Sequence, residues 1–279
     1  MPRQNVAELN GYACEPFEYG GIRHDVYRGG DAGPVVLLLH EMPSFSYRTV
    51  QLANHIRDRG YRIVMPILVG GIRNQPYRGR AGALRMGADF GVNVVRFCMS
   101  WEFVGLLQHR TSPITSWLLQ LARTEADGNG QRQVGVIGMC MSGGFALATA
   151  IDPVVGVAVV SQPAVPFASG PLRWIPGQAA DLGLSEVDRL RLVDRKDDAD
   201  FCVRAFRFTK DSIAPAERVA RIEAELAPGA TLTSIPSQTR AAHSVLTDAT
   251  DVAKDPSTEA AIKAALASVI ATLDERLKV

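Results

Sequence analysis

The sequence lacks the patterns that mark nucleic-acid-binding, membrane-spanning and secreted proteins. Its 279 residues hold 30 Lys and Arg against 29 Asp and Glu, which gives a net charge of only +1. A chain without an excess of positive charge has no electrostatic signal for nucleic acid or for an anionic membrane surface. No apolar run approaches the roughly 20 residues that a membrane-spanning helix needs. The opening stretch MPRQNVAELNGYACEPFEYGG has no continuous apolar core, so we expect no signal peptide.

Cysteine and histidine are too few and too scattered to build a disulfide framework or a metal cluster. The four cysteines form no C-x-x-C pair, and the five histidines show no H-x-x-x-H spacing. The sequence therefore predicts free thiols, a reducing cytoplasmic location and no metal site. A phosphate-binding loop is also incomplete, because Gly144 stands where the lysine after Gly138 and Gly143 is required. We expect no cofactor.

What the sequence does have is a regular alternation of apolar runs and amphipathic segments. Continuous apolar runs are typical of strands buried on both faces of a sheet. The predicted strands are 34–40, 62–66, 133–138, 154–160, 205–208 and, more weakly, 231–236. The predicted helices between and after them are the stretch from Phe45 to Asp58, then 112–122, 214–226 and 255–273. This order predicts an α/β fold with a mostly parallel sheet covered by helices on both faces, and residues 17–30 alternate as an antiparallel edge hairpin.

We expect one domain over residues 1–279, because no linker, repeat or low-complexity tract divides the chain. Two stretches, 67–100 and 161–200, are longer than simple connections. Long connections at the carboxyl end of a parallel sheet tend to be functional, so we expect a lid at about 161–200. The first stretch carries four arginines, at 73, 78, 80 and 85. They are candidates for binding an acidic substrate, although a solvated surface is the simpler interpretation.

The stretch VGVIGMCMSGG, from Val134 to Gly144, indicates a tight turn between a strand and a helix. A nucleophile elbow holds its reactive residue on such a turn, and the residues two positions away must be small. Gly138 and Ser142 meet this requirement around Cys140. Ser142 is the alternative nucleophile, but bulky Phe145 follows it closely. The simpler alternative is that Cys140 is a buried core thiol.

A thiol nucleophile benefits from a base, and this fold places its acid and its histidine after the nucleophile, in that order. His243 is the one histidine after Cys140, between the last predicted strand and the last predicted helix. Asp211 comes three residues after Phe208, where the acid belongs. Taken singly, His243 is also explained as a surface or capping residue, and Asp211 as a helix cap. Together the three positions are much less easily explained by accident.

The chain resembles the dienelactone hydrolase family of α/β-hydrolases, in order, from about Pro34 to the C-terminus. The stretch LLLHEMPSFSYRTVQLANHIRDRGYRIVMPILVG resembles the family's strand that ends in His-Glu, with the helix and strand that follow. VGVIGMCMSGGFALATA resembles its cysteine elbow, RFTKDSIAPAERV its acid loop and AAHSVLT its histidine loop. The resemblance implies an α/β-hydrolase fold.

It also implies roles for individual residues. Cys140 would be the nucleophile, His243 the base and Asp211 the acid that orients it. Glu41 would contact the resting thiol and take its proton when substrate binds. The backbone N–H groups of Met42 and Met141 would form the oxyanion hole.

One position departs from the family's pattern. Its dienelactone-cleaving members carry an arginine four residues after the histidine, where this chain has Thr247. The substrate class indicated is therefore a small carboxylic ester or lactone in general, cleaved through an acyl-thioester without a cofactor. The rival interpretations are a catalytically weak relative that binds a small molecule, a serine esterase using Ser142, and a purely structural protein.

Overall fold

The structure is a computed structural model that describes residues 9–73, 79–103, 110–168, 174–240, 242–247 and 256–278. Its main sheet has eight strands in the order β1-β2-β5-β3-β7-β8-β9-β10. Their bounds are Ala13–Tyr19 (β1), Ile22–Gly29 (β2), Val35–Leu39 (β3), Arg62–Pro66 (β5), Val134–Met139 (β7), Val155–Ser161 (β8), Val203–Phe208 (β9) and Ala230–Ile235 (β10). A small second sheet pairs β4 (Phe45–Ser46) with β6 (Ile72–Arg73).

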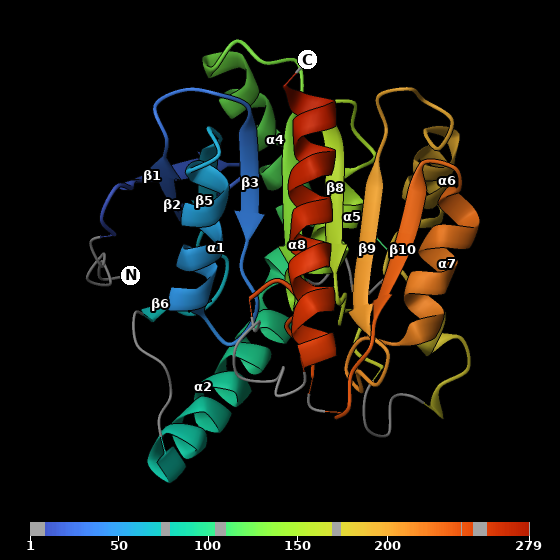
Figure 1. Ribbon diagram of the computed structural model, residues 1–279. Helices are drawn as coiled ribbons and strands as arrows, with labels where there is room; N and C mark the ends of the chain where they lie inside the picture. Colours follow the sequence, from blue (N-terminus) through green and yellow to red (C-terminus); the bar gives the residue numbers. More distant parts are fainter. Residues whose placement is uncertain are drawn as a thin grey trace.

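The sheet is parallel from β5 to β10, and only the hairpin β1–β2 runs antiparallel to it. This confirms the predicted mostly parallel sheet and its antiparallel edge hairpin. The central strands are apolar along their whole length because both of their faces are covered: every residue of β3, β7 and β8 is buried. The parallel strands therefore end at one common edge, at the bottom of Figure 1.

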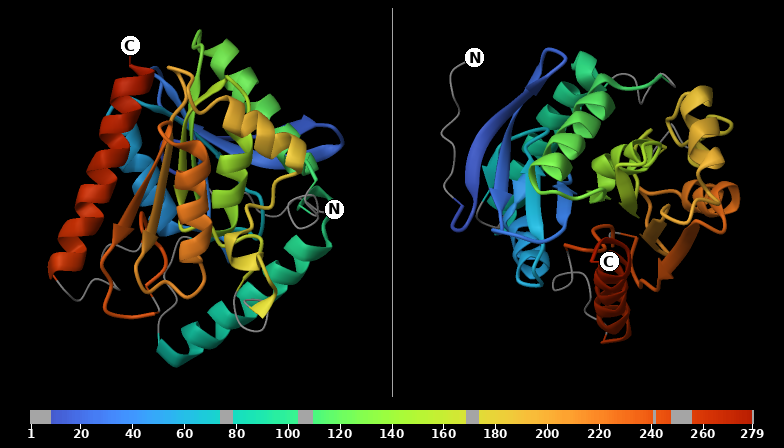
Figure 2. Two further views of the ribbon diagram at one scale, coloured as in Figure 1. Left: turned by 90° about the vertical axis from the view of Figure 1, so that its right-hand side faces the viewer. Right: turned by 90° about the horizontal axis from the view of Figure 1, so that it is seen from above.

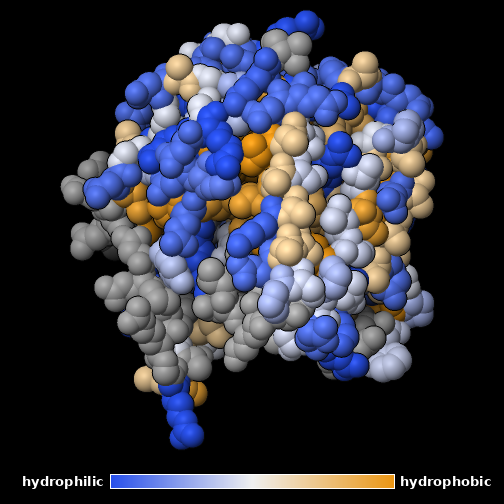
Figure 3. All heavy atoms as spheres, viewed as in Figure 1, coloured by the Kyte–Doolittle hydropathy of each residue, from blue (hydrophilic) through white to orange (hydrophobic). Residues whose placement is uncertain are grey.

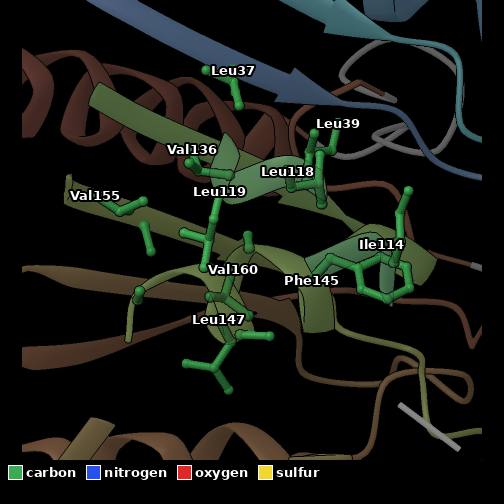
Figure 4. Packing of buried hydrophobic residues seen from close by; sticks show 14 of the residues in the cluster. Leu37, Leu39, Ile114, Leu118, Leu119, Val136, Phe145, Leu147, Val155 and Val160 are labelled. Carbon is green, nitrogen blue, oxygen red and sulfur yellow. The ribbon is translucent and has the colours of Figure 1, made fainter. Parts of the chain in front are cut away.

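Helices cover both faces of the sheet (Figures 1 and 2). On one face, α1 (Tyr47–Arg57) and α8 (Pro256–Leu277) share a hydrophobic cluster with alternate residues of the strands. On the other face lie α4 (Pro113–Gly128), α5 (Gly143–Thr149) and α7 (Ala216–Leu226). Figure 4 shows the core of this second face, where Leu118 of α4 and Phe145 of α5 pack beside Leu39. In Figure 3 the face with α1 and α8 is largely hydrophilic, with hydrophobic side chains visible between the two helices.

Each predicted helix begins with a local signal in the sequence. The hydroxyl of Ser46 accepts from the backbone N–H of Thr49 and caps α1. Pro113 occupies the first turn of α4, a position where its missing N–H costs nothing. The apolar stripe of α4 is buried as its helical spacing predicts.

The stretch 67–100, which we interpreted as a long connection, contains the 21-residue helix α2 (Gly79–Met99). The helical pattern was masked by glycines at 79, 82, 87 and 91, a residue type that disfavours helix interiors. The helix projects from the carboxyl edge of the sheet (Figure 1). It is attached through Asn93, whose side chain donates to the Pro43 carbonyl at 2.9 Å, and through Phe97, which stacks on Phe103.

The stretch 161–200 begins beside the elbow and then packs on α7. It contains the short turn η3 (Gln178–Ala180) and the helix α6 (Glu186–Asp194), the helix that Ser185 caps. The buried guanidinium of Arg218 on α7 donates to four backbone carbonyls of this stretch, those of Pro163, Pro166, Gln178 and Asp181. Residues 169–173 lie outside the described residues. A lid over Cys140 stays a prediction.

Candidate active site

Five neighbouring strands, β3, β7, β8, β9 and β10, each lead at their carboxyl ends into a residue of the candidate site. Glu41 follows β3, Cys140 follows β7, Asp211 follows β9 and His243 follows β10. The strand between those of Cys140 and Asp211 is β8, which leads directly into Gln162. Ligands of open α/β sheets bind at this edge, so the topology alone gathers these side chains at the usual place for a site.

Cys140 sits on the turn between β7 and α5 with φ +55°, in the left-handed region. Only two described residues other than glycine adopt a positive φ, and both are at this edge of the sheet. A non-glycine residue rarely adopts this conformation, and a strand-to-helix turn that imposes it presents the side chain at the top of the sheet. The Cys140 side chain is nearly buried, with 7% exposure.

The glycines around the turn are required by its tight packing. A Cβ atom on Gly138 would lie 2.2 Å from the Ser142 carbonyl oxygen and 2.7 Å from Cβ of Ala146. A Cβ atom on Gly143 would lie 3.0 Å from Cα of Pro163. The elbow therefore excludes larger side chains at these positions, as the sequence pattern around Cys140 predicts.

Ser142 is fully buried, and its hydroxyl is engaged in the turn itself. The oxygen accepts from the Met139 N–H at 2.9 Å. It also lies 3.1 Å from the carbonyl oxygen of Leu39 and 3.0 Å from that of Met139, to one of which it donates. These bonds tie the elbow to the end of β3 and give the hydroxyl a structural task.

Asp211 and His243 are brought together across the ends of β9 and β10. Nδ1 of His243 donates to Oδ2 of Asp211 at 2.7 Å. The other carboxylate oxygen of Asp211 accepts from the backbone N–H groups of Ile213 and Ala214, at 2.8 and 3.0 Å. Asp211 is thus fixed in its own loop, and α7 begins later, after Pro215. The carboxylate holds the histidine ring in the tautomer that leaves Nε2 free of its proton when the ring is neutral.

The environment of His243 favours its protonated form. Burial lowers the pKa of the imidazole, but the charge of ionised Cys140 and the hydrogen bond to Asp211 raise it, and the balance lies well above the usual value. Nε2 is buried and, among the described residues, has no hydrogen-bond partner of ordinary geometry. A buried ring nitrogen without a partner, next to a thiol, is suited to receive a proton from it.

Glu41 is buried at the end of β3 and is held by three neutral donors. Ser244 donates to its Oε2 at 2.8 Å, Thr247 donates to its Oε1, and Nε2 of Gln162 lies 3.5 Å from Oε2. The family resemblance implies a contact with the resting thiol. In the described part of the chain, no hydrogen bond joins this carboxylate to Cys140, and its partners belong mainly to the histidine loop.

Sequence reasoning missed Gln162 and Arg207. Gln162 is fully buried, has φ +35° and contacts both Glu41 and the backbone of Val245. Arg207 on β9 donates to the backbone carbonyls of the acid loop, including that of Asp211 at 3.2 Å. A polar residue directly after an apolar strand at this edge of the sheet was the available signal for Gln162. Arg207, inside a strand, gave no such signal.

The remaining predicted residues lie around this group. Met42 and Met141 follow the paired positions Leu39 and Gly138 of neighbouring strands, so their backbones flank the elbow. Arg73 is paired with Asp89 of α2, which occupies its guanidinium. The side chains of the residues at positions 80 and 85 are exposed, and position 78 lies outside the described residues.

Neither a metal cluster nor a membrane-spanning helix occurs in the described ranges. No three His, Cys, Asp or Glu side chains there are grouped so that they could hold a metal ion. No described helix is both long and apolar enough to cross a membrane.

Comparison with solved structures shows the same fold at low sequence identity. Dienelactone hydrolase from Anabaena variabilis is 16% identical with a TM-score of 0.57, over 95% of this chain and 98% of that one. A cold-adapted esterase from an Arctic intertidal metagenomic library is 13% identical with a TM-score of 0.58, over 99% and 98%. The thioesterase domain of the curacin biosynthetic pathway is 13% identical with a TM-score of 0.51, over 94% and 100%.

Comparison with curated proteins finds no match. Comparison with protein families matches residues 25–277, nearly the whole chain, to the dienelactone hydrolase family. That range contains the elbow, the acid loop and the histidine loop. The chain belongs to the dienelactone hydrolase family.

Proposed function

We propose that the chain is a cysteine-dependent hydrolase of carboxylic esters or lactones that works through an acyl-thioester. The observation that carries this proposal is the buried, unpartnered Nε2 of His243, oriented by Asp211 and acting on a cysteine held on a strained turn. Each of these features is what a thiol nucleophile and its base need. The esterase, dienelactone hydrolase and thioesterase among the similar structures cleave acyl bonds, which supports the same reaction class.

The reaction proceeds in two halves. His243 takes the thiol proton of Cys140 as the sulfur attacks the substrate carbonyl carbon. The resulting oxyanion accepts hydrogen bonds from the backbone N–H groups of Met42 and Met141. The carbon–oxygen bond to the leaving group then breaks, and His243 returns the proton to the departing alkoxide. A thioester between Cys140 and the acyl group remains.

Water completes the cycle by the same route. His243 removes a proton from the water as it attacks the thioester, and the proton goes to the departing sulfur. The products are the carboxylic acid and the free thiol. No cofactor takes part in either half.

The test compares two buried thiols of the same chain. Cys140→Ala abolishes multiple-turnover hydrolysis of a p-nitrophenyl ester, measured as nitrophenol release, because the attacking atom is gone. Cys202 is also buried but stands before β9, away from the elbow, so Cys202→Ala is the matched control and keeps the wild-type rate. Full activity of Cys140→Ala would sink the proposal. A wild-type protein that releases one equivalent and stops would indicate the binding relative instead.

A further inference from the structure

We infer that Gln162 is a positioning residue that fixes the histidine loop, residues 242–247, against Glu41. The inference rests on the proposed role of His243, which this loop carries. Gln162 stands directly after β8, between the strands that lead into Cys140 and Asp211. It touches neither the thiol nor the imidazole in any described hydrogen bond, so its action is indirect.

The backbone of Gln162 is held in an unfavourable conformation. Its φ is +35°, and its N–H donates to the carbonyl of Phe206 on β9 at 2.7 Å. Glycine adopts a positive φ without steric cost and is the ordinary residue at such a position. A completely buried glutamine there indicates that the side chain itself is needed.

The orientation of the Gln162 amide follows from its partners. A backbone N–H only donates, and that of Val245 points at Oε1 of Gln162 at 3.2 Å. The hydroxyl of Ser161 also donates to this oxygen. The amide nitrogen must therefore face the other way, toward Oε2 of Glu41 at 3.5 Å. The amide bridges a carboxylate and a backbone N–H, which a carboxylate or an apolar side chain in its place does not do.

Glu41 and Gln162 together grip the same loop on both sides of its sequence. Ser244 and Thr247 donate to Glu41, and the N–H of Val245 donates to Gln162. The loop that presents His243 is thus fixed through three consecutive or near-consecutive residues. Small displacements of a catalytic base are costly, so this grip sets the position of Nε2.

The charges around the bridge favour an amide at position 162. The groups that face Glu41 are neutral hydroxyls and the amide of Gln162, and His40, whose ring donates to the Glu41 carbonyl, is kept neutral by burial. A second carboxylate at 162 would meet Glu41 without a cation to separate them. Like charges at this distance repel strongly unless one is protonated.

The test is a reciprocal exchange of the two side chains, Gln162→Glu, Glu41→Gln and the double variant. We measure kcat and KM for a neutral p-nitrophenyl ester across pH, together with the melting temperature of each variant. Gln162→Glu is expected to lower kcat at least tenfold with less than a threefold change in KM, and the loss deepens as pH rises because the paired carboxylates then both ionise. The double variant restores one carboxylate and one amide and recovers kcat to within about threefold of wild type.

A structural filler would behave differently. In that case kcat falls in step with melting temperature in every variant, and the double variant is no better than the worse single one, which would overturn the inference. If Gln162→Glu does not fold, the isosteric Gln162→Met replaces it. Lost kcat at an unchanged melting temperature supports the inference, and an unchanged kcat overturns it. Failure of the Cys140 test in the wild-type protein would instead overturn the proposed function, so the two failures are distinct.

Discussion

His243 takes its charge from two neighbours that act on opposite sides of its ring. Asp211 holds Nδ1 through a bond of 2.7 Å, and Cys140 acts on the side of Nε2. Burial alone would lower the pKa of the imidazole, so its raised value depends on these two residues. The base and the nucleophile are therefore coupled electrostatically, and a change in one is measurable in the other.

Removing the thiol should lower the pKa of His243. In Cys140→Ala, burial still opposes protonation while one of the two opposing causes is lost, so the pKa moves downward from its wild-type value. An NMR titration of the His243 ring protons in both proteins measures this shift. The same titration in Cys202→Ala gives the control, which should match wild type. A His243 pKa that is unchanged in Cys140→Ala would show that the two groups do not interact.

At the scale of elements, the elbow and the exposed helix α2 use glycine for opposite reasons. Gly138 is surrounded at its missing Cβ by the Ser142 carbonyl and by Ala146. Gly91 of α2 has no atom within 4 Å of the same position. The first glycine is required by close packing, whereas the second only weakens its helix.

The two glycines should respond oppositely to alanine. Gly138→Ala forces the elbow apart and is expected to destabilise the fold by several kcal/mol, with loss of esterase activity. Gly91→Ala adds a helix-favouring side chain in open space and should stabilise the protein by about 0.5–1 kcal/mol. Denaturant unfolding of both variants measures the two free energies. A neutral Gly138→Ala would contradict the packing described at the elbow.

Most of the elements were predictable because their signals are local. The apolar runs of β3, β7 and β8 and the start of α4 at Pro113 are read directly from the chain. The helix α2 was not predicted, because its glycines interrupt the helical pattern and its outer face is not buried by the sheet. A helix that buries little shows little of the periodicity on which prediction depends.

The site was predictable to the extent that strand order alone determines it. Placing a nucleophile, an acid and a histidine after successive strands was sufficient for Cys140, Asp211 and His243. The partners of Glu41 depend on tertiary contacts between β3 and a loop 200 residues later, and nothing near Glu41 in the sequence indicates them. Gln162 is missing for the same reason, since its two contacts come from opposite ends of the chain.

At the scale of the whole molecule, His40 makes stability depend on pH. Its Nδ1 donates to the Glu41 carbonyl, and its Nε2 accepts from the backbone of Leu68, at 2.9 and 3.0 Å. The ring thus joins the end of β3 to the segment after β5. It is completely buried, and burial lowers its pKa to about 4.

Acid should therefore unfold the protein partly through His40. The unfolded chain binds this proton near pH 6.5, and the folded chain binds it only near pH 4, so stability falls as pH decreases through that interval. The full loss is about 3 kcal/mol, from the shift of between two and three pKa units. Denaturant unfolding at pH 7 and pH 4 measures it. In His40→Gln this part of the pH dependence disappears, and an identical pH dependence in both proteins would contradict the assignment.

The account as a whole depends on a covalent bond between substrate and Cys140. Rapid-quench mass spectrometry of the intact protein and its peptides, during turnover of a p-nitrophenyl ester, tests this most directly. The account predicts an acyl adduct on the peptide that contains Cys140, which forms and decays while nitrophenol release continues. An adduct that maps to Ser142, or undiminished turnover in Cys140→Ala with no adduct on position 140 in the wild type, would contradict it.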